Sequence, residues 1–398
     1  METTYQHKPL QHCIRVLHVL PTMQCGGIGN WLMTVLRNSD REYLRHDFLC
    51  LRDEPSCYYL PEIREHNAHF FRLPCHYENI FKLPRAFRQV IQQHGPYEAV
   101  HCHCEWYNGV ILKHVAKCGV PVRIAHTHVN RGNAEPIRKR LDPARLLRIS
   151  RRKRLIRKYA THSIACSEGA GKAIWGDSWG KDPRRQTLYC GIDLKPFSAA
   201  VDKTEVRQEL EIPQDALVVG HVGRFGIEKN HTFMIDILSE LVRLESKAIL
   251  LLVGGGNEEL QKNLCRKIDH LGLKDRVIFT GFRADIPRLL QGAMDCLLFP
   301  SLHEGLGLVG VEAQAAGIPC VMSDHIPLAT EGNVVPGLIY PVPLAAPAID
   351  WARQIQKLQN RASLPAPSDA LDLVLQSKFN IDTSLNLMIR LWANETVQ

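Results

Sequence analysis

Two glutamates eight positions apart, Glu304 and Glu312, have the types and spacing of a ligand-binding pair. They belong to the stretch Pro300–Pro319, in which a glycine-rich loop follows an expected strand and precedes an expected helix. The unpaired N–H groups of the first helical turn form an anion site suited to a diphosphate. At ~1.5 Å per helical residue, eight positions span at most about 12 Å, comparable to the reach from a sugar ring across a diphosphate to a ribose. The two carboxylates can hold hydroxyls at both ends of a nucleotide sugar, although an isolated pair at this spacing is also typical of a solvated surface.

A cationic pair lies in the loop that follows another expected strand, Leu217–Val222. Gly223 permits a tight turn there, and Arg224 and Lys229 can meet at the carboxyl end of the sheet, where open α/β folds bind ligands. A bidentate guanidinium together with a compact ammonium forms a clamp for a departing diphosphate. The alternative is that two cations in one loop are only surface charge.

The elements that must position these side chains alternate between short apolar strands and amphipathic helices such as 231–244 and 258–270. The expected strands form two series, 14–20, 99–103, 120–126 and 162–166 in the first, and 217–222, 248–253, 277–280, 296–299 and 320–322 in the second. Buried strands that alternate with helices form parallel sheets covered on both faces. We therefore predict an α/β protein of two Rossmann-like domains, residues 1–192 and 193–375. A C-terminal helix within 376–398 can pack on either domain, and we expect it to cross back to the first.

Together with Leu251–Gly256 and Val277–Pro287, these motifs resemble the family 4 glycosyltransferases of the GT-B fold, especially those of bacterial exopolysaccharide and capsule assembly. The resemblance runs from about Val16 to Arg390. It implies a retaining glycosyltransferase that moves a sugar from a nucleotide-diphosphate sugar, UDP preferred and GDP the alternative, to a saccharide acceptor that is lipid-linked. The first domain then binds the acceptor and the second binds the nucleotide sugar across a cleft. Because cations neutralise the leaving diphosphate, we expect no resident cofactor and no metal requirement.

The resemblance also assigns roles to individual residues. Arg224 and Lys229 match the diphosphate ligands, Glu312 the carboxylate on the ribose, and Glu304 the carboxylate near the donor sugar. His126 matches a histidine under the reacting sugar, so the expected catalytic residues are His126, Arg224, Lys229 and Glu304. The full set of expected donor contacts is Gly26, Gly27, Gly223, Arg224, Lys229, Phe282, Arg283, Glu304, Gly305, Leu306, Gly307, Leu308 and Glu312.

Other classes of function leave different marks on the sequence. A catalytically silent nucleotide-sugar-binding subunit, or a nucleotide-sugar epimerase or hydrolase of the same fold, remains an alternative to the transferase. A dehydrogenase is disfavoured because the Gly27–Gly29 pair lacks the third glycine of a dinucleotide fingerprint. His101-Cys102-His103-Cys104 resembles a metal site, but strand alternation sends the histidines to one face and the cysteines to the other. We expect ordinary packing there, or an acceptor-side lining role for His103.

Composition and charge place the chain among globular proteins, with 45% hydrophobic and 23% charged residues in 398. The thirteen cysteines are scattered, which predicts reduced thiols in a cytoplasmic protein. Basic residues concentrate in the segment 137–158, which has eleven basic side chains and one acidic one and includes Arg151, Arg152, Lys153 and Arg154. A helix edged by arginines can lie on an anionic membrane, so we expect peripheral contact with the inner face of the plasma membrane, with a solvated helix as the alternative. Aromatic stacking residues are missing from this segment, which disfavours nucleic acid as a partner.

Overall fold

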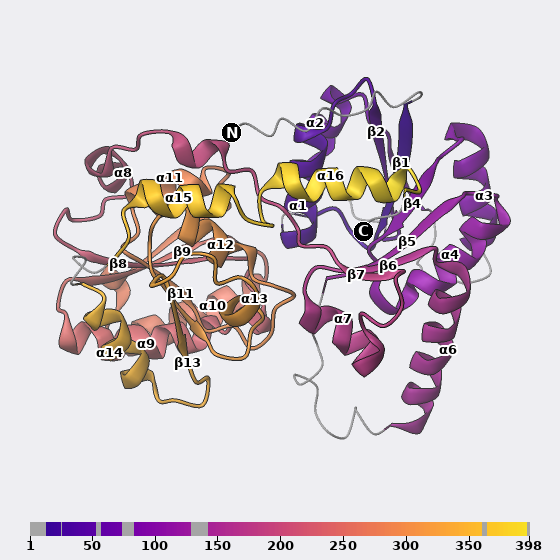
Figure 1. Cartoon of the computed structure of the whole chain (residues 1–398). Helices are drawn as coiled ribbons and strands as arrows, with labels where there is room; N and C mark the ends of the chain where they lie inside the picture. The colour runs from indigo at the N-terminus through magenta and orange to yellow at the C-terminus, as the bar shows by residue number, and fades with distance from the viewer. Residues whose placement is uncertain are drawn as a thin grey trace.

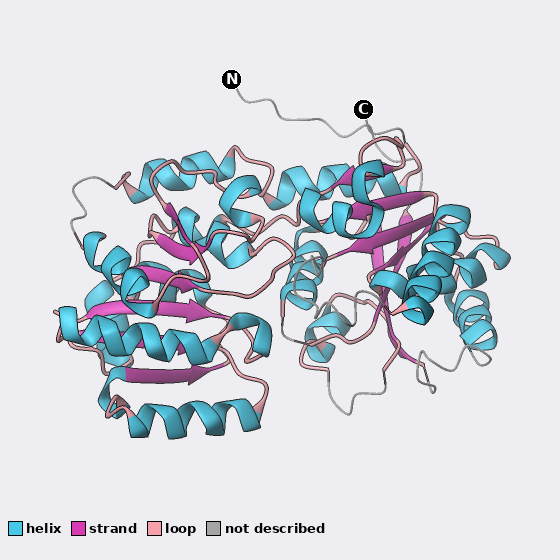
Figure 2. Cartoon of the chain, turned by 90° about the horizontal axis from the view of Figure 1, so that it is seen from below, coloured by secondary structure: helices cyan, strands magenta, loops and turns pink. Residues whose placement is uncertain are grey.

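The computed structural model describes residues 13–24, 26–52, 57–73, 83–128, 142–359 and 364–395. Within these ranges the chain forms two lobes, each built on its own parallel sheet with helices on both faces (Figures 1 and 2). The predicted α/β class with two Rossmann-like domains is confirmed. Every cysteine among the described residues is a free thiol.

The N-terminal lobe contains a seven-stranded sheet in the order β3-β2-β1-β4-β5-β6-β7 among the described residues. Its strands are β1 (Ile14–Leu20), β2 (Leu44–Cys50), β3 (Phe70–Arg72), β4 (Ala99–Cys102), β5 (Val122–Thr127), β6 (His162–Ala165) and β7 (Arg185–Thr187). Its helices are α1 (Gly27–Asn38), α2 (Leu60–Glu65), α3 (Leu83–His94), α4 (Asn108–Lys117), α6 (Pro143–Tyr159) and α7 (Glu168–Trp175).

The C-terminal lobe contains a six-stranded sheet in the order β10-β9-β8-β11-β12-β13 among the described residues. Its strands are β8 (Leu217–Val222), β9 (Ala248–Val253), β10 (Val277–Gly281), β11 (Cys296–Phe299), β12 (Cys320–Ser323) and β13 (Ile339–Val342). Its helices are α8 (Lys203–Glu209), α9 (His231–Leu244), α10 (Glu258–His270), α11 (Ile286–Gly292), α12 (Leu308–Ala315), α13 (Leu328–Glu331), α14 (Ala348–Lys357) and α15 (Pro367–Leu375).

Apolar strands explain why both sheets are covered on both faces. All six residues of β9 are buried, and alternate side chains of this strand pack into two different hydrophobic clusters. A strand that is apolar on both faces is stable only between two layers of helices. The crossover helices of the parallel sheet supply those layers.

Two segments connect the lobes and lie side by side. Ile192 N donates to Phe379 O at 2.8 Å, and Ile381 N donates to Ile192 O at 3.0 Å. Beyond this crossing, the last helix α16 (Ile381–Trp392) packs Leu385, Met388 and other apolar residues into the core of the N-terminal lobe. Figure 1 shows α16 in yellow reaching from the side of α15 to β1.

Candidate active site

The expected cation Lys229 and the expected carboxylate Glu304 are in direct contact. Lys229 Nζ donates to Glu304 Oε1 at 2.7 Å, and only 17% and 13% of the two side chains are exposed. Lys229 lies just after β8 and Glu304 just after β11, and these strands are neighbours in the sheet. Parallel neighbours end at the same edge of a sheet, so their loops meet there. A main-chain hydrogen bond from Leu302 N to Glu228 O, at 2.8 Å, joins the two loops directly.

The surroundings of Lys229 leave no room for a bulkier loop. A Cβ added at Gly223 would lie 3.0 Å from His221 Nε2 and 3.3 Å from Lys229 Cε. On another side, Lys229 Nζ lies 5.2 Å from the centre of the Phe299 ring. The pKa of His221 is lowered well below its usual value and that of His231 to about 4; burial is the main cause, and the Lys229 ammonium contributes to both shifts. Both imidazoles are therefore neutral, and Lys229 is the local positive charge.

Arg224 belongs to the same loop but makes a different ion pair. Its Nη2 donates to Glu228 Oε1 at 3.2 Å, and about half of its side chain is exposed. Its Cγ would lie 3.0 Å from a Cβ at Gly256, so it packs beside the loop that follows β9. Among the described residues, no hydrogen bond joins Arg224 to the Lys229–Glu304 pair. The structure thus brings two of the expected residues into contact and leaves Arg224 beside them with an exposed guanidinium.

Helix α12 begins where the sequence predicts an anion-binding helix terminus. Gly307 precedes the helix with φ 97°, a left-handed conformation that favours glycine, and no side chain caps the first turn. Glu312 lies in the second turn of α12 and is half-buried. Burial raises the pKa of its carboxyl to about 7. Within the described residues, no hydrogen-bond partner is present for this carboxyl, so it is available to a ligand.

The loop that follows β10 carries the residues expected near the base. The ring of Phe282 is 55% exposed and would lie 2.9 Å from a Cβ at Gly255. The Arg283 guanidinium is held by Asp285 Oδ2 at 2.7 Å and Glu209 Oε1 at 2.8 Å. Its side chain therefore fixes this loop to α8, which leaves the main chain as the part of Arg283 able to meet a ligand.

In the N-terminal lobe, α1 starts at the expected glycine loop. A Cβ at Gly26 or Gly27 would meet no atom within 4 Å, so this loop borders open space. Gly29 differs, because a Cβ there would lie 2.2 Å from Gln24 O. The local backbone therefore admits only glycine at this position.

His103 and His126 are placed differently from the expectation of residues that line a cleft. Both side chains are buried within a cluster of neutral imidazoles, which we call the histidine cluster. The cluster lies between the sheet and the indole rings of Trp31 and Trp392. Its members are His18, His46, His101, His103, His126 and His128. Contact of His103 or His126 with a ligand stays a prediction.

Hydrogen bonds assign the protons along one row of the histidine cluster. Ser39 Oγ donates to a main-chain carbonyl of α1, so it accepts from His46 Nε2 at 2.8 Å. A neutral imidazole has one N–H, so His46 Nδ1 accepts from His18 Nε2 at 3.0 Å, and His18 Nδ1 accepts from His103 Nε2 at 3.3 Å. His103 Nδ1 then accepts from His128 Nε2 at 2.8 Å. The row is a one-way hydrogen-bonded chain of neutral rings.

Two overlapping triads in the histidine cluster have the spacing of metal ligands. In each, the candidate nitrogen atoms lie within 4.8 Å of one another; the triads are His18, His101 and His103, and His103, His126 and His128. The hydrogen bonds of the row occupy most of these nitrogens, and His101 Nε2 pairs with His126 Nδ1 at 3.1 Å. His126 Nε2 is buried without a partner among the described atoms. The cluster is thus held together by hydrogen bonds, which a metal would have to replace.

As predicted, Cys102 and Cys104 lie in the core on the other face of the sheet.

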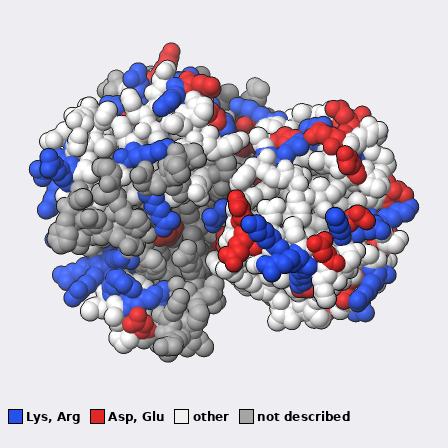
Figure 3. Space-filling model, turned by 180° about the vertical axis from the view of Figure 1, so that it is seen from behind, with Lys and Arg blue, Asp and Glu red and all other residues white. Residues whose placement is uncertain are grey.

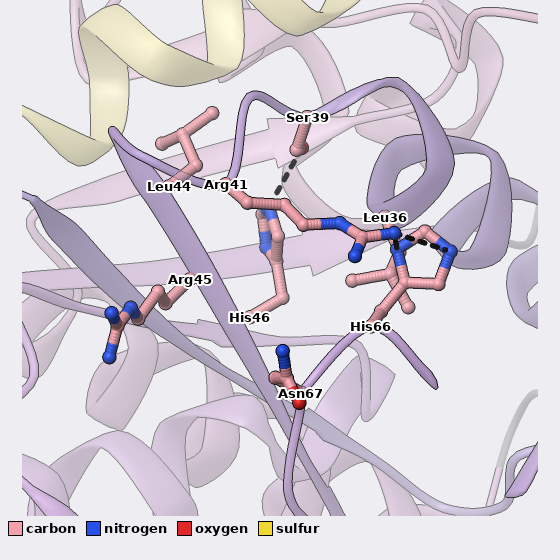
Figure 4. Close-up of a pocket in the computed structure, with 8 residues that line it drawn as sticks. All are labelled: Leu36, Ser39, Arg41, Leu44, Arg45, His46, His66 and Asn67. Carbon is pink, nitrogen blue, oxygen red and sulfur yellow. Dashed lines mark hydrogen bonds between the residues drawn. The ribbon is translucent and has the colours of Figure 1, made fainter. Parts of the chain in front are cut away.

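A cavity of about 330 Å³ opens at the far end of this row (Figure 4). Leu36, Ser39, Arg41, Leu44, Arg45, His46, His66 and Asn67 line it. At its floor Ser39 and His46 are hydrogen-bonded to each other, and at its rim Arg41 Nη2 donates to His66 Nδ1 at 3.1 Å. None of the expected donor or catalytic residues lines this cavity, so it is separate from the Lys229–Glu304 site.

The described part of the basic segment is helix α6; residues 137–141 lie outside the described residues. Arg151 and Arg154 are exposed, whereas Arg152 lies 3.9 Å from the ring centre of Tyr107 and Lys153 lies 5.5 Å from that of Trp106. Leu146 and Leu147 are exposed at 48% and 55%. The side of the N-terminal lobe that carries α6 shows a group of basic side chains in Figure 3.

The protein is a two-domain α/β protein with the Lys229–Glu304 pair at the carboxyl edge of its second parallel sheet, and comparisons with known proteins identify its family. A model described as "Glycosyltransferase Family 4" matches residues 25–195, and one described as "Glycosyl transferases group 1" matches residues 202–362. The chain is 33% identical over 354 residues to the putative glycosyltransferase EpsF of Bacillus subtilis, covering 86% of this chain and 87% of that protein. The chain belongs to the family 4 glycosyltransferases.

Other relatives match less of the sequence or only the fold. The UDP-Gal:alpha-D-GlcNAc-diphosphoundecaprenol alpha-1,3-galactosyltransferase of Escherichia coli is 30% identical over 169 residues, 41% of this chain and 43% of that protein. The crystal structure of Anabaena Alr3699/HepE in complex with UDP-glucose matches 96% of this chain and 100% of that one, with a TM-score of 0.77 and 22% identity. This likeness confirms the GT-B fold.

Proposed function

We propose that the protein is a retaining glycosyltransferase that moves a sugar from a UDP-sugar to a saccharide acceptor, lipid-linked, in exopolysaccharide or capsule assembly. The Lys229–Glu304 contact carries the proposal, because it brings a phosphate-binding cation and a hydroxyl-binding carboxylate together at the carboxyl edge of the sheet. The family supports transfer. The E. coli relative is a UDP-Gal-dependent galactosyltransferase by name and the HepE structure is a complex with UDP-glucose, and both support UDP as the nucleotide.

The proposed reaction needs a stabilised leaving group. The bond from the anomeric carbon to the diphosphate oxygen breaks, a bond to the acceptor oxygen forms on the same face, and the acceptor proton passes to a phosphate oxygen. Lys229, Arg224 and the uncapped first turn of α12 neutralise the diphosphate. These bond changes and the proton transfer need no redox partner and no metal, so we propose that no cofactor is required.

The experiment is incubation of the purified protein with a panel of UDP- and GDP-sugars and a lipid-linked saccharide, in EDTA. Mass spectrometry of the acceptor and NMR of the new anomeric proton are expected to show transfer with retained configuration. Rapid donor breakdown without acceptor would support the epimerase or hydrolase instead. Nucleotide-sugar binding, seen as a raised melting temperature, without turnover would support the silent binding subunit.

The half-buried carboxyl of Glu312 makes donor binding depend on pH. Its pKa of about 7 means that it is charged above pH 7 and accepts hydroxyl hydrogen bonds, and that it gains a proton below pH 7. Hydrogen bonds to a charged group contribute about 1.5–3 kcal/mol, so the protonated form binds donor weakly. Because one group with a pKa of about 7 titrates, we expect the donor KM to rise up to about tenfold between pH 8 and pH 6. Glu312→Gln is expected to bind donor weakly at both pH values, whereas Glu259→Gln, an exposed control on α10, retains the wild-type profile. A flat wild-type profile would contradict this role.

We also propose that α6 contacts anionic membrane, because Arg151 and Arg154 are exposed beside Leu146 and Leu147. Each basic residue near such a surface contributes about 1 kcal/mol, so the double variant Arg151→Glu, Arg154→Glu should bind liposomes at least tenfold more weakly at low salt. The matched control is Lys262→Glu, Arg266→Glu on exposed α10. Flotation with phosphatidylserine vesicles measures the difference, and absence of wild-type binding would refute the contact. None of the described helices has the length and apolar composition needed to cross a bilayer.

A further inference from the structure

A carboxylate of the C-terminal lobe holds the start of a helix in the N-terminal lobe. Glu331, at the end of α13, accepts from Glu168 N at 2.7 Å and from Gly169 N at 3.1 Å. These are the first N–H groups of α7, which have no partner within their own helix. Glu331 also accepts from the Tyr189 hydroxyl at 3.1 Å. One side chain thus bridges the lobes through three hydrogen bonds.

The charge of Glu331 suits this position. A carboxylate at a helix N-terminus is stabilised by the helix dipole and by the unpaired N–H groups. Burial raises the pKa of Tyr189, and the Glu331 carboxylate raises it further, so the phenol remains a hydrogen-bond donor. Lys378 Nζ lies 3.8 Å from the centre of the Tyr189 ring and places a positive charge near the bridge.

The residue before α7 makes a second bridge, to the donor loop. Ser167 is fully buried, and its Oγ accepts from Ala170 N at 3.0 Å and donates to Gly305 O at 2.6 Å. Gly305 is packed directly on the N-terminal lobe, since a Cβ there would lie 1.9 Å from His128 O. The helix that Glu331 holds and the loop that Ser167 holds therefore belong to one interlobe contact, which we call the α7 clasp: Ser167, Glu168 N, Gly169 N, Gly305 O and Glu331.

The α7 clasp fixes the direction of a main-chain N–H in the donor loop. In a trans peptide the C=O and the following N–H point in opposite directions. Because Gly305 O points to Ser167, the N–H of Leu306 points away from Ser167. Leu306 is one of the residues expected to offer its N–H to the donor.

We propose that Ser167 and Glu331 are positioning residues for sugar transfer, which couple the contact between the lobes at the α7 clasp to the orientation of the Gly305–Leu306 peptide. This inference rests on the proposed function, because it assigns the Leu306 N–H to the donor. Neither side chain touches the reacting atoms. Opening of the lobes breaks the Glu331 bonds and frees the peptide at the same time.

The first test compares Glu331→Ala and Glu331→Gln with the wild type by small-angle scattering and steady-state kinetics. Glu331→Gln removes the charge but keeps one acceptor, and Glu331→Ala removes both acceptors. We expect both variants to have a larger radius of gyration than the wild type and a kcat lowered about 10- to 100-fold, because the loss of one or more hydrogen bonds to a charged group has an effect of this size. Glu331→Ala is expected to be more affected than Glu331→Gln. The dissociation constant of UDP is expected to stay within about threefold, because the other donor residues are intact. The matched control is Glu168→Gln, whose exposed side chain pairs with Lys172 while its N–H remains.

The second test concerns Ser167. Ser167→Ala is expected to lower kcat about tenfold without changing the radius of gyration, and Ser167→Thr, which keeps the hydroxyl, to restore kcat. Wild-type kcat in Ser167→Ala and Glu331→Ala would overturn the proposal. A larger radius of gyration with unchanged kcat would overturn the positioning role as well. If the wild type transfers no sugar from any donor, the proposed function fails. The radius of gyration of Glu331→Ala, compared with that of the wild type, still tests whether Glu331 holds the two lobes together.

Discussion

Lys229→Met is expected to lower kcat about 10²- to 10³-fold, because loss of one preorganised charge contact to a developing anion has an effect of this size. Methionine keeps the length of the side chain but removes the ammonium. It also leaves the mostly buried Glu304 carboxylate without the cation at 2.7 Å, so that Glu304 repels the incoming diphosphate. Steady-state kinetics at saturating donor and acceptor measures the effect.

The control for this variant is Lys247→Met, because Lys247 forms an exposed ion pair with Asp215 in the same lobe and exposed pairs contribute little. A double variant with Glu304→Gln separates the two effects of losing Lys229. Since Lys229 and Glu304 share one ion pair, we expect their substitutions to be non-additive in kcat. A kcat of Lys229→Met within about threefold of wild type would remove Lys229 from the catalytic residues.

The apolar strands of the fold could be predicted from the sequence because their pattern is local. The expected strands 14–20, 217–222 and 248–253 coincide with β1, β8 and β9, and the expected helices 231–244 and 258–270 coincide with α9 and α10. Strands buried on both faces appear as continuous apolar runs, and their crossover helices have a clear apolar face. These elements suffice to predict two parallel sheets.

Strand β2 was missed because its polar residues interrupt the apolar pattern. His46 is buried in the histidine cluster, and Asp47 accepts from the Tyr97 hydroxyl at 2.7 Å and from Arg15 at 3.3 Å. These partners come from other strands and loops, so nothing within Leu44–Cys50 indicates that its polar side chains are satisfied. Sequence patterns report burial of apolar groups, not the distant partners of polar ones.

The candidate site was predictable to the extent that it follows strand ends. Lys229 and Glu304 each follow a buried strand, and the parallel topology brings such positions together. Ser167 and Glu331 were missed because their roles depend on how two separate lobes are placed. The sequence around Ser167 indicates only a helix N-cap, and no local pattern indicates that its hydroxyl also reaches Gly305 O.

The buried histidine cluster predicts an acid-sensitive N-terminal lobe. Burial lowers the pKa of His46 to about 4, although the neighbouring Asp47 carboxylate opposes this shift in part. Burial also lowers the pKa of His128 to about 3. The pKa values of His18, His101 and His103 are lowered well below the usual value for the same reason. The unfolded chain takes up protons near pH 6.5 while the folded cluster stays neutral, so stability is full above pH 6.5 and is lost as pH falls below it.

The size of this loss follows from the slope of about 1.4 kcal/mol per pH unit for each such histidine. Several histidines together remove several kcal/mol by pH 5.5, out of the ~5–15 kcal/mol typical of a domain. We expect the melting temperature to fall by about 10 °C or more between pH 7 and pH 5.5, and urea unfolding to show the same trend. His46→Gln, which can keep the bonds to Ser39 and His18, should reduce the slope by one histidine, whereas exposed His270→Gln should leave it unchanged. Stability that is constant from pH 7 to pH 5.5 would show that the cluster already holds protons in the folded protein.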